Sequence, residues 1–304
     1  MLKAKKPEVI EKRPKLFFFG AAGVGKTRAA LQFGRNYHID CERGADNYAD
    51  LYAASNSVRL QTTDYDEVIE QLKSLATERH DFQTVTIDPI TVLETDLNMR
   101  SEDAIAAEFR AKDKSATEAA QLAVGDMRIW RNRDRSLRRL GNLLLALDMN
   151  VIVTAREKTK YKEGSFMVAV GETFDGEKSL PYLFDTIVRL WKDPQGRHLG
   201  TCLKDRSNKL PKEDFAASYA IFESVFGQQA LDRKAKPLTL ATEEQKQAIA
   251  AAIEQFGMTA DQVARRLAAY GADSLDALTK ENAELILKKF KEFQAAAAKE
   301  PGKT

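Results

Sequence analysis

The sequence predicts an α/β protein with a mainly parallel sheet, followed by a small α-helical domain. A glycine-rich loop at residues 20–27 stands between an apolar strand and a helical pattern. After it, short apolar segments alternate with helical patterns, and such alternation builds parallel strands joined by right-handed crossovers. The region from 241 to 295, in contrast, shows only the helical spacing of apolar residues.

The elements follow in chain order. Residues 15 to 39 predict a strand, the glycine-rich loop, a helix and a second strand ending at "YHID". The segment "YDEVIEQLKSLATERHDF" has apolar residues at helical spacing, and "TVTID" is a short buried-type strand. The polar, alanine-rich region 90–125 predicts helices joined by mobile loops. A basic helix through "WRNRDRSLRRLGNLLLALDMN" then leads into the strand "VIVTA", and "DTIVRLWKD" with "GTCLKD" predicts a hairpin edge.

The helical region has start signals at Thr242, Thr259 and Thr279 and a turn at "YGADS". Its alanine-rich end "FQAAAAKEPGKT" is expected to fray. We therefore divide the chain into an N-terminal arm at 1–14, an α/β core at 15–225, a linker at 226–240, a helical module at 241–295 and a disordered tail at 296–304.

The composition is that of an ordinary globular protein. Of 304 residues, 43% are hydrophobic and 30% are charged, which allows one substantial core and a smaller module. The formal charge of +2 is nearly balanced, so any nucleic-acid surface must be local. Two cysteines, Cys41 and Cys202, exclude a disulfide framework and a complete cysteine zinc site. No run approaches the roughly 18 apolar residues of a membrane span, and the charged start "MLKAKKPEVIEKRPK" is unlike a secretory signal. We expect a cytoplasmic protein without a membrane partner.

The glycine-rich loop has the pattern G-x-x-x-x-G-K-T, which is typical of a phosphate-binding loop. Its backbone N–H groups turn inward at a helix N-terminus, where the dipole favours anions. Lys26 is expected to reach the β- and γ-phosphates, and the Thr27 hydroxyl to hold Mg²⁺. The predicted nucleotide-binding residues are Gly20, Ala21, Ala22, Gly23, Val24, Gly25, Lys26, Thr27 and Arg28. The loop identifies the ligand as a nucleotide but leaves the reaction open.

Carboxylates stand at two predicted strand ends. Asp88 ends "TVTID", where a P-loop enzyme presents an acidic residue to the metal, although it could instead cap the turn at Pro89. In "HIDCERG", strand alternation would put Asp40 and Glu42 on one face. Hydrolysis needs a carboxylate that orients the attacking water, so Glu42 is the candidate base. The alternative is that both are solvated loop charges.

These segments, in this order, resemble RecA-type recombinases. "HIDCERG" resembles their I-D-x-E segment, in which the glutamate activates water, and "TVTIDPITVL" resembles their Walker B strand. "LRRLGNLLLALDMNVIVTAR" resembles the helix and strand before their second DNA loop, and "LKDRSNKLPK" their subunit interface. With its "VIVTARE" ending, the chain is most similar to phage RecA-like single-strand-annealing ATPases of the Sak type. The resemblance implies a RecA-like P-loop NTPase core over residues 15 to 215 that uses ATP and Mg²⁺.

The chain departs from this family at two places. The recombinases' N-terminal oligomerisation region is essentially missing, and their Asn-Gln pair at the end of the sensor strand is replaced by Thr154-Ala155, followed by Arg156. Either Thr154 or Arg156 would then contact the γ-phosphate. Because no N-K-x-D motif for guanine is visible, ATP is preferred over GTP.

The family resemblance also implies two DNA-facing stretches, at 110–133 and 157–178. The second, "REKTKYKEGSF", interleaves cations with rings on which unpaired bases could stack. "MRIWRNRDR" repeats the combination. The predicted DNA-binding residues are Arg128, Arg131 and Arg133 beside Trp130, and Lys158, Lys160, Tyr161 and Lys162 beside Phe166. The alternative is a solvated charged face with core aromatics, which for Trp130 is the favoured interpretation. Binding is expected to be sequence-independent and salt-sensitive.

Two further predictions concern partners. Lys204 and Arg206 alternate along a likely strand end, and in the resembling recombinases the matching pair reaches a neighbouring subunit's γ-phosphate. The alternative is a charged edge strand that deters aggregation. The helical module resembles the small end domain of several phage recombination proteins, so it is expected either to dock a partner such as the host single-strand-binding protein or to be a structural cap.

The resemblance favours an oligomeric, DNA-dependent ATPase of phage recombination that binds single-stranded DNA and promotes annealing or strand exchange in the bacterial cytoplasm. One alternative is a RecA-like nucleic-acid motor or loader, which would unwind DNA. Another is a nucleotide-switched interaction protein, which would have no need of the base Glu42.

Overall fold

The computed structural model describes residues 13–112, 114–162, 164, 168–272 and 274–297. The chain forms two compact units. One comprises Met1–Gln71, His80–Leu137 and Asp148–Ala235, and the other Leu72–Arg79, Arg138–Leu147 and Lys236–Thr304. Within the described residues, no helix is long and apolar enough to cross a membrane.

The first unit is built on a mostly parallel sheet. Its described strands follow the order β3-β2-β4-β5-β1-β7-β8-β9, and β6 pairs with β5. Strands β1, β2, β3, β4, β5 and β7 pair in parallel with one another, whereas β8, β9 and β6 pair antiparallel. The strands are β1 Lys15–Gly20, β2 Asn36–Asp40, β3 Val58–Gln61, β4 Thr84–Asp88, β5 Asn150–Tyr161, β6 Ala169–Phe174, β7 Thr186–Lys192, β8 His198–Asp205 and β9 Phe215–Ala216. The predicted α/β fold is confirmed.

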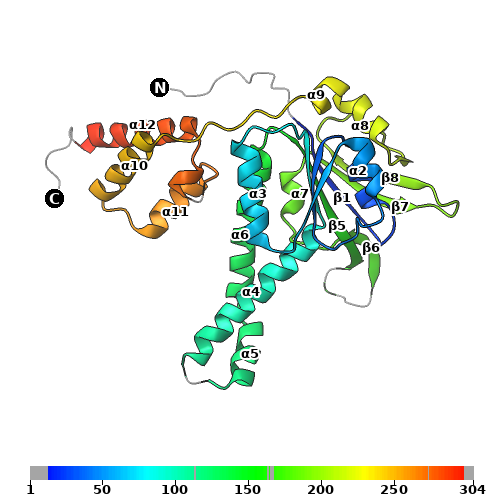
Figure 1. Ribbon diagram of the computed structural model, residues 1–304. Helices are drawn as coiled ribbons and strands as arrows, with labels where there is room; N and C mark the ends of the chain where they lie inside the picture. Colours follow the sequence, from blue (N-terminus) through cyan, green and yellow to red (C-terminus); the bar gives the residue numbers. More distant parts are fainter. Residues whose placement is uncertain (1–12, 113, 163, 165–167, 273, 298–304) are drawn as a thin grey trace. The chain divides into compact units, whose positions relative to one another are not determined.

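The helices connect these strands and make up the C-terminal part (Figure 1). Those up to the last strand are α1 Lys26–Leu31, α2 Ala49–Ser55, α3 Tyr65–Thr77, α4 Ile90–Arg110, α5 Ala116–Val124, α6 Arg128–Ala146 and α7 Leu180–Leu183. The later ones are α8 Tyr219–Phe226, α9 Gln228–Asp232, α10 Glu243–Gln255, α11 Ala260–Ala268 and α12 Lys280–Ala297, with a 3₁₀ turn at Leu275–Ala277. Helix α9 lies inside the segment predicted as a linker.

The apolar run of β1 is buried because both faces of the sheet are covered there. Leu16 and Phe18 join one core cluster, in which the Phe18 and Phe222 rings lie 5.5 Å apart. Phe17 turns to the opposite face and packs against Phe174 and Phe184, with ring centroids 5.3 and 5.2 Å away. A strand buried on both faces reads as a continuous apolar run, which is how "LFFF" reads in the sequence.

The region predicted as helices with mobile loops contains one long helix, α4, and the shorter α5. The two helices and the start of α6 share a small cluster formed by Ile105, Ala123 and Ile129. Arg128 at the start of α6 pairs with Glu108 on α4 at 2.6 Å, and Figure 1 shows these helices side by side, extending from the sheet. The weak periodicity of the sequence has a physical reason, since this extension buries only a narrow apolar stripe.

Strand β5 is longer than the predicted "VIVTA". It continues to Tyr161 and pairs with β6, from Glu157 opposite Phe174 to Tyr161 opposite Ala169. The polar stretch after the predicted strand is therefore a hairpin, which we name the β5–β6 hairpin (residues 157–174). Its outer residues are exposed, so they lack the apolar alternation by which strands are recognised.

The three helix starts predicted in the C-terminal module agree with the structure. Thr242 and Thr259 cap α10 and α11 with full capping boxes, and Thr279 Oγ1 accepts from Asn282 N in the first turn of α12. At the other end of the chain, Arg13 and Pro14 are buried although they belong to the predicted arm. The predicted tail 296–304 lies mostly outside the described residues, but α12 runs to Ala297.

Candidate functional site

The predicted phosphate-binding loop lies between β1 and α1. Lys26 is the first residue of α1, and its Nζ donates to the carbonyl oxygens of Gly20 and Ala21 at 2.9 Å each. Burial lowers the pKa of Lys26, whereas the nearby carboxylates of Asp88 and Glu42 raise it. The ammonium group is therefore held inside the loop, near the place where a nucleotide's phosphates are expected.

Glycine is required at particular positions of this loop. Gly23 and Gly25 have positive φ angles of 74° and 97°, a region that other residues adopt only with strain. A Cβ atom on Gly20 would lie 2.2 Å from the carbonyl oxygen of Leu190 on β7, and one on Gly25 would lie 2.6 Å from the Nδ1 atom of His198. The loop is thus packed closely against the β7–β8 hairpin.

His198 was not recognised from the sequence. Its Nδ1 atom donates to the carbonyl oxygen of Val24 at 2.7 Å, which fastens the middle of the loop to the first residue of β8. No sequence motif connects two residues so far apart in the chain, and only the sheet order brings them together.

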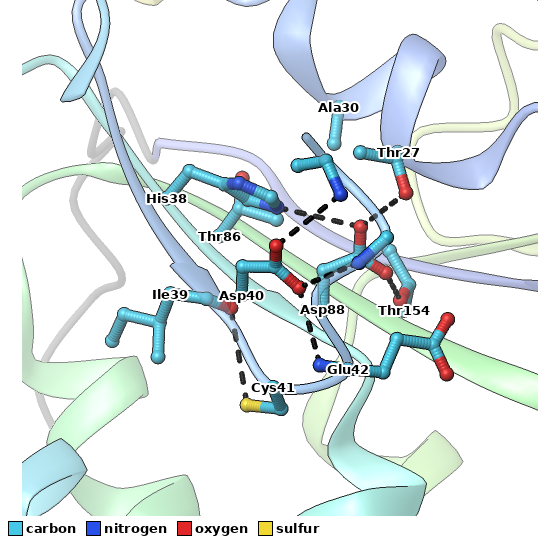
Figure 2. Close-up of polar contacts among 12 residues, drawn as sticks. Thr27, Ala30, His38, Ile39, Asp40, Cys41, Glu42, Thr86, Asp88 and Thr154 are labelled. Carbon is cyan, nitrogen blue, oxygen red and sulfur yellow. Dashed lines mark hydrogen bonds and ion pairs between the residues drawn. The ribbon is translucent and has the colours of Figure 1, made fainter. Parts of the chain in front are cut away.

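Asp88, at the end of β4, is the centre of the site (Figure 2). Its Oδ2 atom accepts a hydrogen bond from the Thr27 hydroxyl at 2.5 Å, and its Oδ1 atom accepts one from the Thr154 hydroxyl. The His38 Nε2 atom lies 3.3 Å from Oδ2. Burial acts to raise the pKa of Asp88, but the hydrogen bonds from His38, Thr154 and Thr27 bring it below its usual value. The carboxylate is therefore kept ionised in a buried position.

His38 on β2 is a second residue that sequence reasoning missed. It is fully buried, and its Nδ1 atom lies 2.5 Å from the Tyr52 hydroxyl on α2. Because the Asp88 carboxylate can only accept, Nε2 carries a proton, and in the neutral ring Nδ1 accepts from Tyr52. The chain Tyr52–His38–Asp88 thus connects α2 to the Asp88 carboxylate.

Asp40 and Glu42 lie beside Asp88, but not as strand alternation predicted. Strand β2 ends at Asp40, so Glu42 belongs to the following bend and the rule of alternating faces does not reach it. The buried Asp40 carboxylate accepts from the backbone N–H of Glu42 at 3.1 Å and pairs with Arg59 at 2.6 Å. Asp40 therefore shapes the bend, and Glu42 is the partly exposed carboxylate that it presents.

Glu42 is paired with Arg156. Arg156 Nη2 lies 2.6 Å and Nε 3.1 Å from Glu42 Oε2, and the two side chains are 53% and 33% exposed. Arg156 follows Thr154 by two residues on β5, so both residues that were candidates for sensing the γ-phosphate lie at the site. Each of them is hydrogen-bonded to a different carboxylate, Thr154 to Asp88 and Arg156 to Glu42.

The base of the β5–β6 hairpin is fastened to α4. Thr91 Oγ1 accepts from Arg156 N at 3.1 Å and donates to the carbonyl oxygen of Asp175 at 2.8 Å. One turn later, Glu94 accepts from Glu177 N at 2.9 Å, and burial raises the pKa of Glu94 to about 7. Both attachments were missed in the sequence, where Thr91 and Glu94 are unremarkable helix residues.

The oxygen atoms at the centre of the site fit Mg²⁺. Thr27 and Asp88 offer a hydroxyl and a carboxylate, which are the hard ligands that this ion takes, and Mg²⁺ commonly completes its shell with water and substrate phosphates. In the described part of the chain, no group of three or more His, Cys, Asp or Glu residues could hold a metal ion.

The predicted DNA-binding residues fall in two places. On α6, Arg128 pairs with Asp126 and Glu108, while the Arg133 guanidinium lies 4.7 Å from the centre of the Trp130 ring. Arg131 is exposed beside them. Trp130 is 49% exposed, contrary to the interpretation of this residue as part of the core.

On the β5–β6 hairpin, Lys158 pairs with Asp175 at 2.9 Å, whereas Lys160, Tyr161 and Lys162 are exposed. Phe166 lies outside the described residues.

Lys204 and Arg206 contact the same segment of the chain, but β8 ends at Asp205, so the predicted alternation along the strand does not reach Arg206. Lys204 Nζ donates to the carbonyl oxygens of Pro181 and Phe184 at 2.7 Å each, and Arg206 pairs with Asp185 at 2.9 Å. Arg206 remains 55% exposed. In the single chain, these cations anchor the residues around α7.

Comparison with known proteins agrees with this geometry. A protein-family model described as an AAA domain matches residues 12–207. This range includes the glycine-rich loop, Glu42, Asp88, Lys204 and Arg206. No curated protein matches the chain.

Proposed function

The chain belongs to the AAA domain family and is a nucleotide-binding P-loop ATPase, and from this premise we propose that it binds single-stranded DNA and promotes annealing or strand exchange in phage recombination. ATP is the proposed nucleotide. The place of action would be the cytoplasm of a bacterial host.

The residues of the site take distinct parts in the proposed hydrolysis. The loop N–H groups and Lys26 bind the β- and γ-phosphates, and Thr27 and Asp88 hold the metal ion. Mg²⁺, when bound, neutralises phosphate charge. Glu42 accepts a proton from the attacking water, for which its partly exposed carboxylate at the edge of the loop is suited. Before it can do so, its ion pair with Arg156 has to open.

One observation supports the DNA-binding part of the proposal. Strand β5 carries Thr154, which contacts Asp88, and Arg156, which contacts Glu42. The same strand then continues into the β5–β6 hairpin with the exposed Lys160 and Lys162. A ligand on this hairpin would therefore contact the strand that touches both catalytic carboxylates, which is the arrangement expected of a DNA-dependent ATPase.

The hairpin has the chemistry that unpaired DNA requires. Lys158 and Lys160 alternate along β5, so they share one face, and the exposed Lys162 follows the end of the strand. Together these cations can follow a phosphate backbone. Tyr161, 51% exposed, offers a ring on which a base can stack. On α6, the exposed Arg131 and the half-exposed Trp130 supply the same combination, whereas Arg133 is 14% exposed and already paired with Asp134 at 2.8 Å.

The test measures binding of fluorescent oligo-dT to the full chain by anisotropy at several salt concentrations. The variant Lys160→Gln/Lys162→Gln is compared with the control Lys192→Gln/Lys212→Gln. The control removes the same charge from exposed positions elsewhere in the α/β domain. Each lost phosphate contact reduces the magnitude of the negative slope of log K against log salt by about 0.7. The slope of the hairpin variant should therefore be smaller in magnitude by about 1.4, and the slope of the control should equal that of the wild type. Equal slopes in both variants would exclude the hairpin as the DNA site.

Annealing is tested with two complementary labelled strands, with and without ATP. Faster annealing in the presence of the protein supports the proposal. Unwinding of a duplex would instead support a RecA-like motor, and nucleotide binding without turnover would support an interaction switch. Self-assembly and docking of the host single-strand-binding protein remain predictions, and imaging the protein with ATP and single-stranded DNA tests the first of them.

A further inference from the structure

The C-terminal module contains a groove that is separate from the nucleotide site. It has a volume of about 890 Å³ and lies between the turn after α10, the outer face of α11 and the second half of α12. Aromatic residues line it, namely Phe256, Tyr270, Phe290 and Phe293, together with Met258. Phe256 and Phe293 are 39% and 53% exposed, so the groove keeps apolar surface in contact with water.

Three cations border the groove. Arg265, Arg266 and Lys289 are among its lining residues, against the one carboxylate of Glu292. Within the described residues, none of these three cations forms an ion pair. Lys246, on another part of the same module, is paired with both Glu243 and Asp276 at 2.7 Å. The module therefore pairs Lys246 with carboxylates of its own, whereas the three cations of the groove are available to an anion from outside.

The aromatic rings of the groove already contact one another and the cations beside them. Phe256 and Phe290 stack with centroids 5.5 Å apart and an interplanar angle of 21°. The Arg266 guanidinium lies 5.4 Å from the centre of the Phe290 ring and 5.8 Å from that of Phe293, and Lys289 Nζ lies 5.1 Å from that of Tyr270. Ring faces covered in this way are poorly placed to stack on nucleic-acid bases, which need open aromatic faces. Their edges and the thioether of Met258 still provide an apolar floor.

From this combination we propose that the groove binds an acidic peptide segment of another protein, one that carries a large apolar side chain beside its carboxylates. The apolar side chain would lie on the aromatic floor, and the carboxylates would pair with Arg265 and Lys289. Arginine and aromatic residues are the types that most often carry binding energy at protein interfaces. The chain's own ends do not fit, because the sequence "AKEPGKT" has two lysines and no large apolar residue, and "MLKAKKPEVIEK" is basic.

The test uses the full chain and a fluorescein-labelled peptide, Glu-Asp-Asp-Glu-Leu-Phe, without nucleotide. Binding is measured by anisotropy for the wild type, for Arg265→Gln/Lys289→Gln, and for Lys288→Gln/Lys291→Gln. The second pair removes the same charge from exposed positions of α12 that do not line the groove. We expect the groove variant to bind at least ten-fold more weakly and the control pair to bind within two-fold of the wild type.

Two further peptides separate the contribution of the acidic side chains to binding from that of the apolar side chains. Gln-Asn-Asn-Gln-Leu-Phe should bind at least ten-fold more weakly because it has lost the acidic side chains, and Glu-Asp-Asp-Glu-Ala-Ala should do the same because it has lost the apolar ones. Thermal unfolding followed by circular dichroism verifies that the variants are folded.

The proposal is overturned if the first peptide does not bind, if the groove variant and the control variant weaken its binding equally, or if oligo-dT displaces the peptide from the wild type but not from the groove variant. Because peptide binding itself is measured without ATP and without DNA, its failure would leave the proposed DNA-binding function untouched, and the reverse is also true.

Discussion

Arg156→Ala should lower ATP turnover by roughly two orders of magnitude, although Arg156 is paired with Glu42, the proposed base. The pair is 2.6 Å long between side chains that are 53% and 33% exposed. Such a pair is worth at most about 1 kcal/mol, so releasing Glu42 can speed turnover by no more than about five-fold. A cation that stabilises charge on the transferred phosphoryl group is worth about 10³-fold. The difference leaves a loss of roughly 200-fold, if Arg156 moves to the γ-phosphate when ATP binds.

The assay is steady-state phosphate release at saturating ATP and Mg²⁺ in the absence of DNA. Lys158→Ala is the matched control, because Lys158 lies two residues further along β5 in an equally exposed ion pair with Asp175. The control should keep wild-type turnover under these conditions. If Arg156→Ala turns over ATP as fast as the wild type or up to five-fold faster, Arg156 only restrains Glu42, and the contact with the γ-phosphate must be assigned to Thr154.

Three further predictions concern other parts of the core. Lys26→Ala should abolish turnover while the thermal unfolding midpoint stays near that of the wild type, because within the described residues the ammonium group donates only to the loop carbonyls; retained turnover would exclude this loop as the phosphate site. A Glu42→Gln chain and a Lys204→Ala/Arg206→Ala chain should each be inactive but regain partial turnover when mixed, if the two cations act on a neighbouring subunit; mixed assemblies without activity would contradict this. Burial lowers the pKa of Lys15 from 10.5 to about 7, so the unfolded chain binds more protons between these values and stability rises with pH. From pH 7 to 9, urea unfolding should therefore show the wild type gaining about 2 kcal/mol more than Lys15→Met, and parallel profiles would contradict the lowered pKa.

The parts of the fold that the sequence predicted well are those where local pattern and burial agree. Strand β1 is buried on both faces, so its apolar run was unambiguous, and the capping boxes of α10 and α11 mark helix starts without any help from tertiary structure. The β5–β6 hairpin is the opposite case. Its outer residues face solvent on both sides, so neither alternation nor an apolar run indicated a strand.

The site shows the same division. Thr27 and Asp88 could be named because each stands at a fixed place in a local motif, and the structure brings them within 2.5 Å. His38 and His198 belong to no motif, and they reach the site only through the order of the strands. Glu42 was named for an incorrect geometrical reason, since β2 ends at Asp40 and the bend that presents Glu42 depends on hydrogen bonds to a buried carboxylate.

The pairing of β5 changes partners at a single residue, and this has a mechanical consequence. From Val151 to Arg156 the strand is fixed between neighbours, paired with β1 along this whole stretch and with β4 up to Val153. From Glu157 onward it pairs only with β6. A force on the outer half of β5 cannot slide the inner half past its neighbouring strands, so the chain has to bend near this boundary. The boundary falls at Arg156, whose side chain contacts Glu42, so bending of the hairpin would move the ion-pair partner of the proposed base.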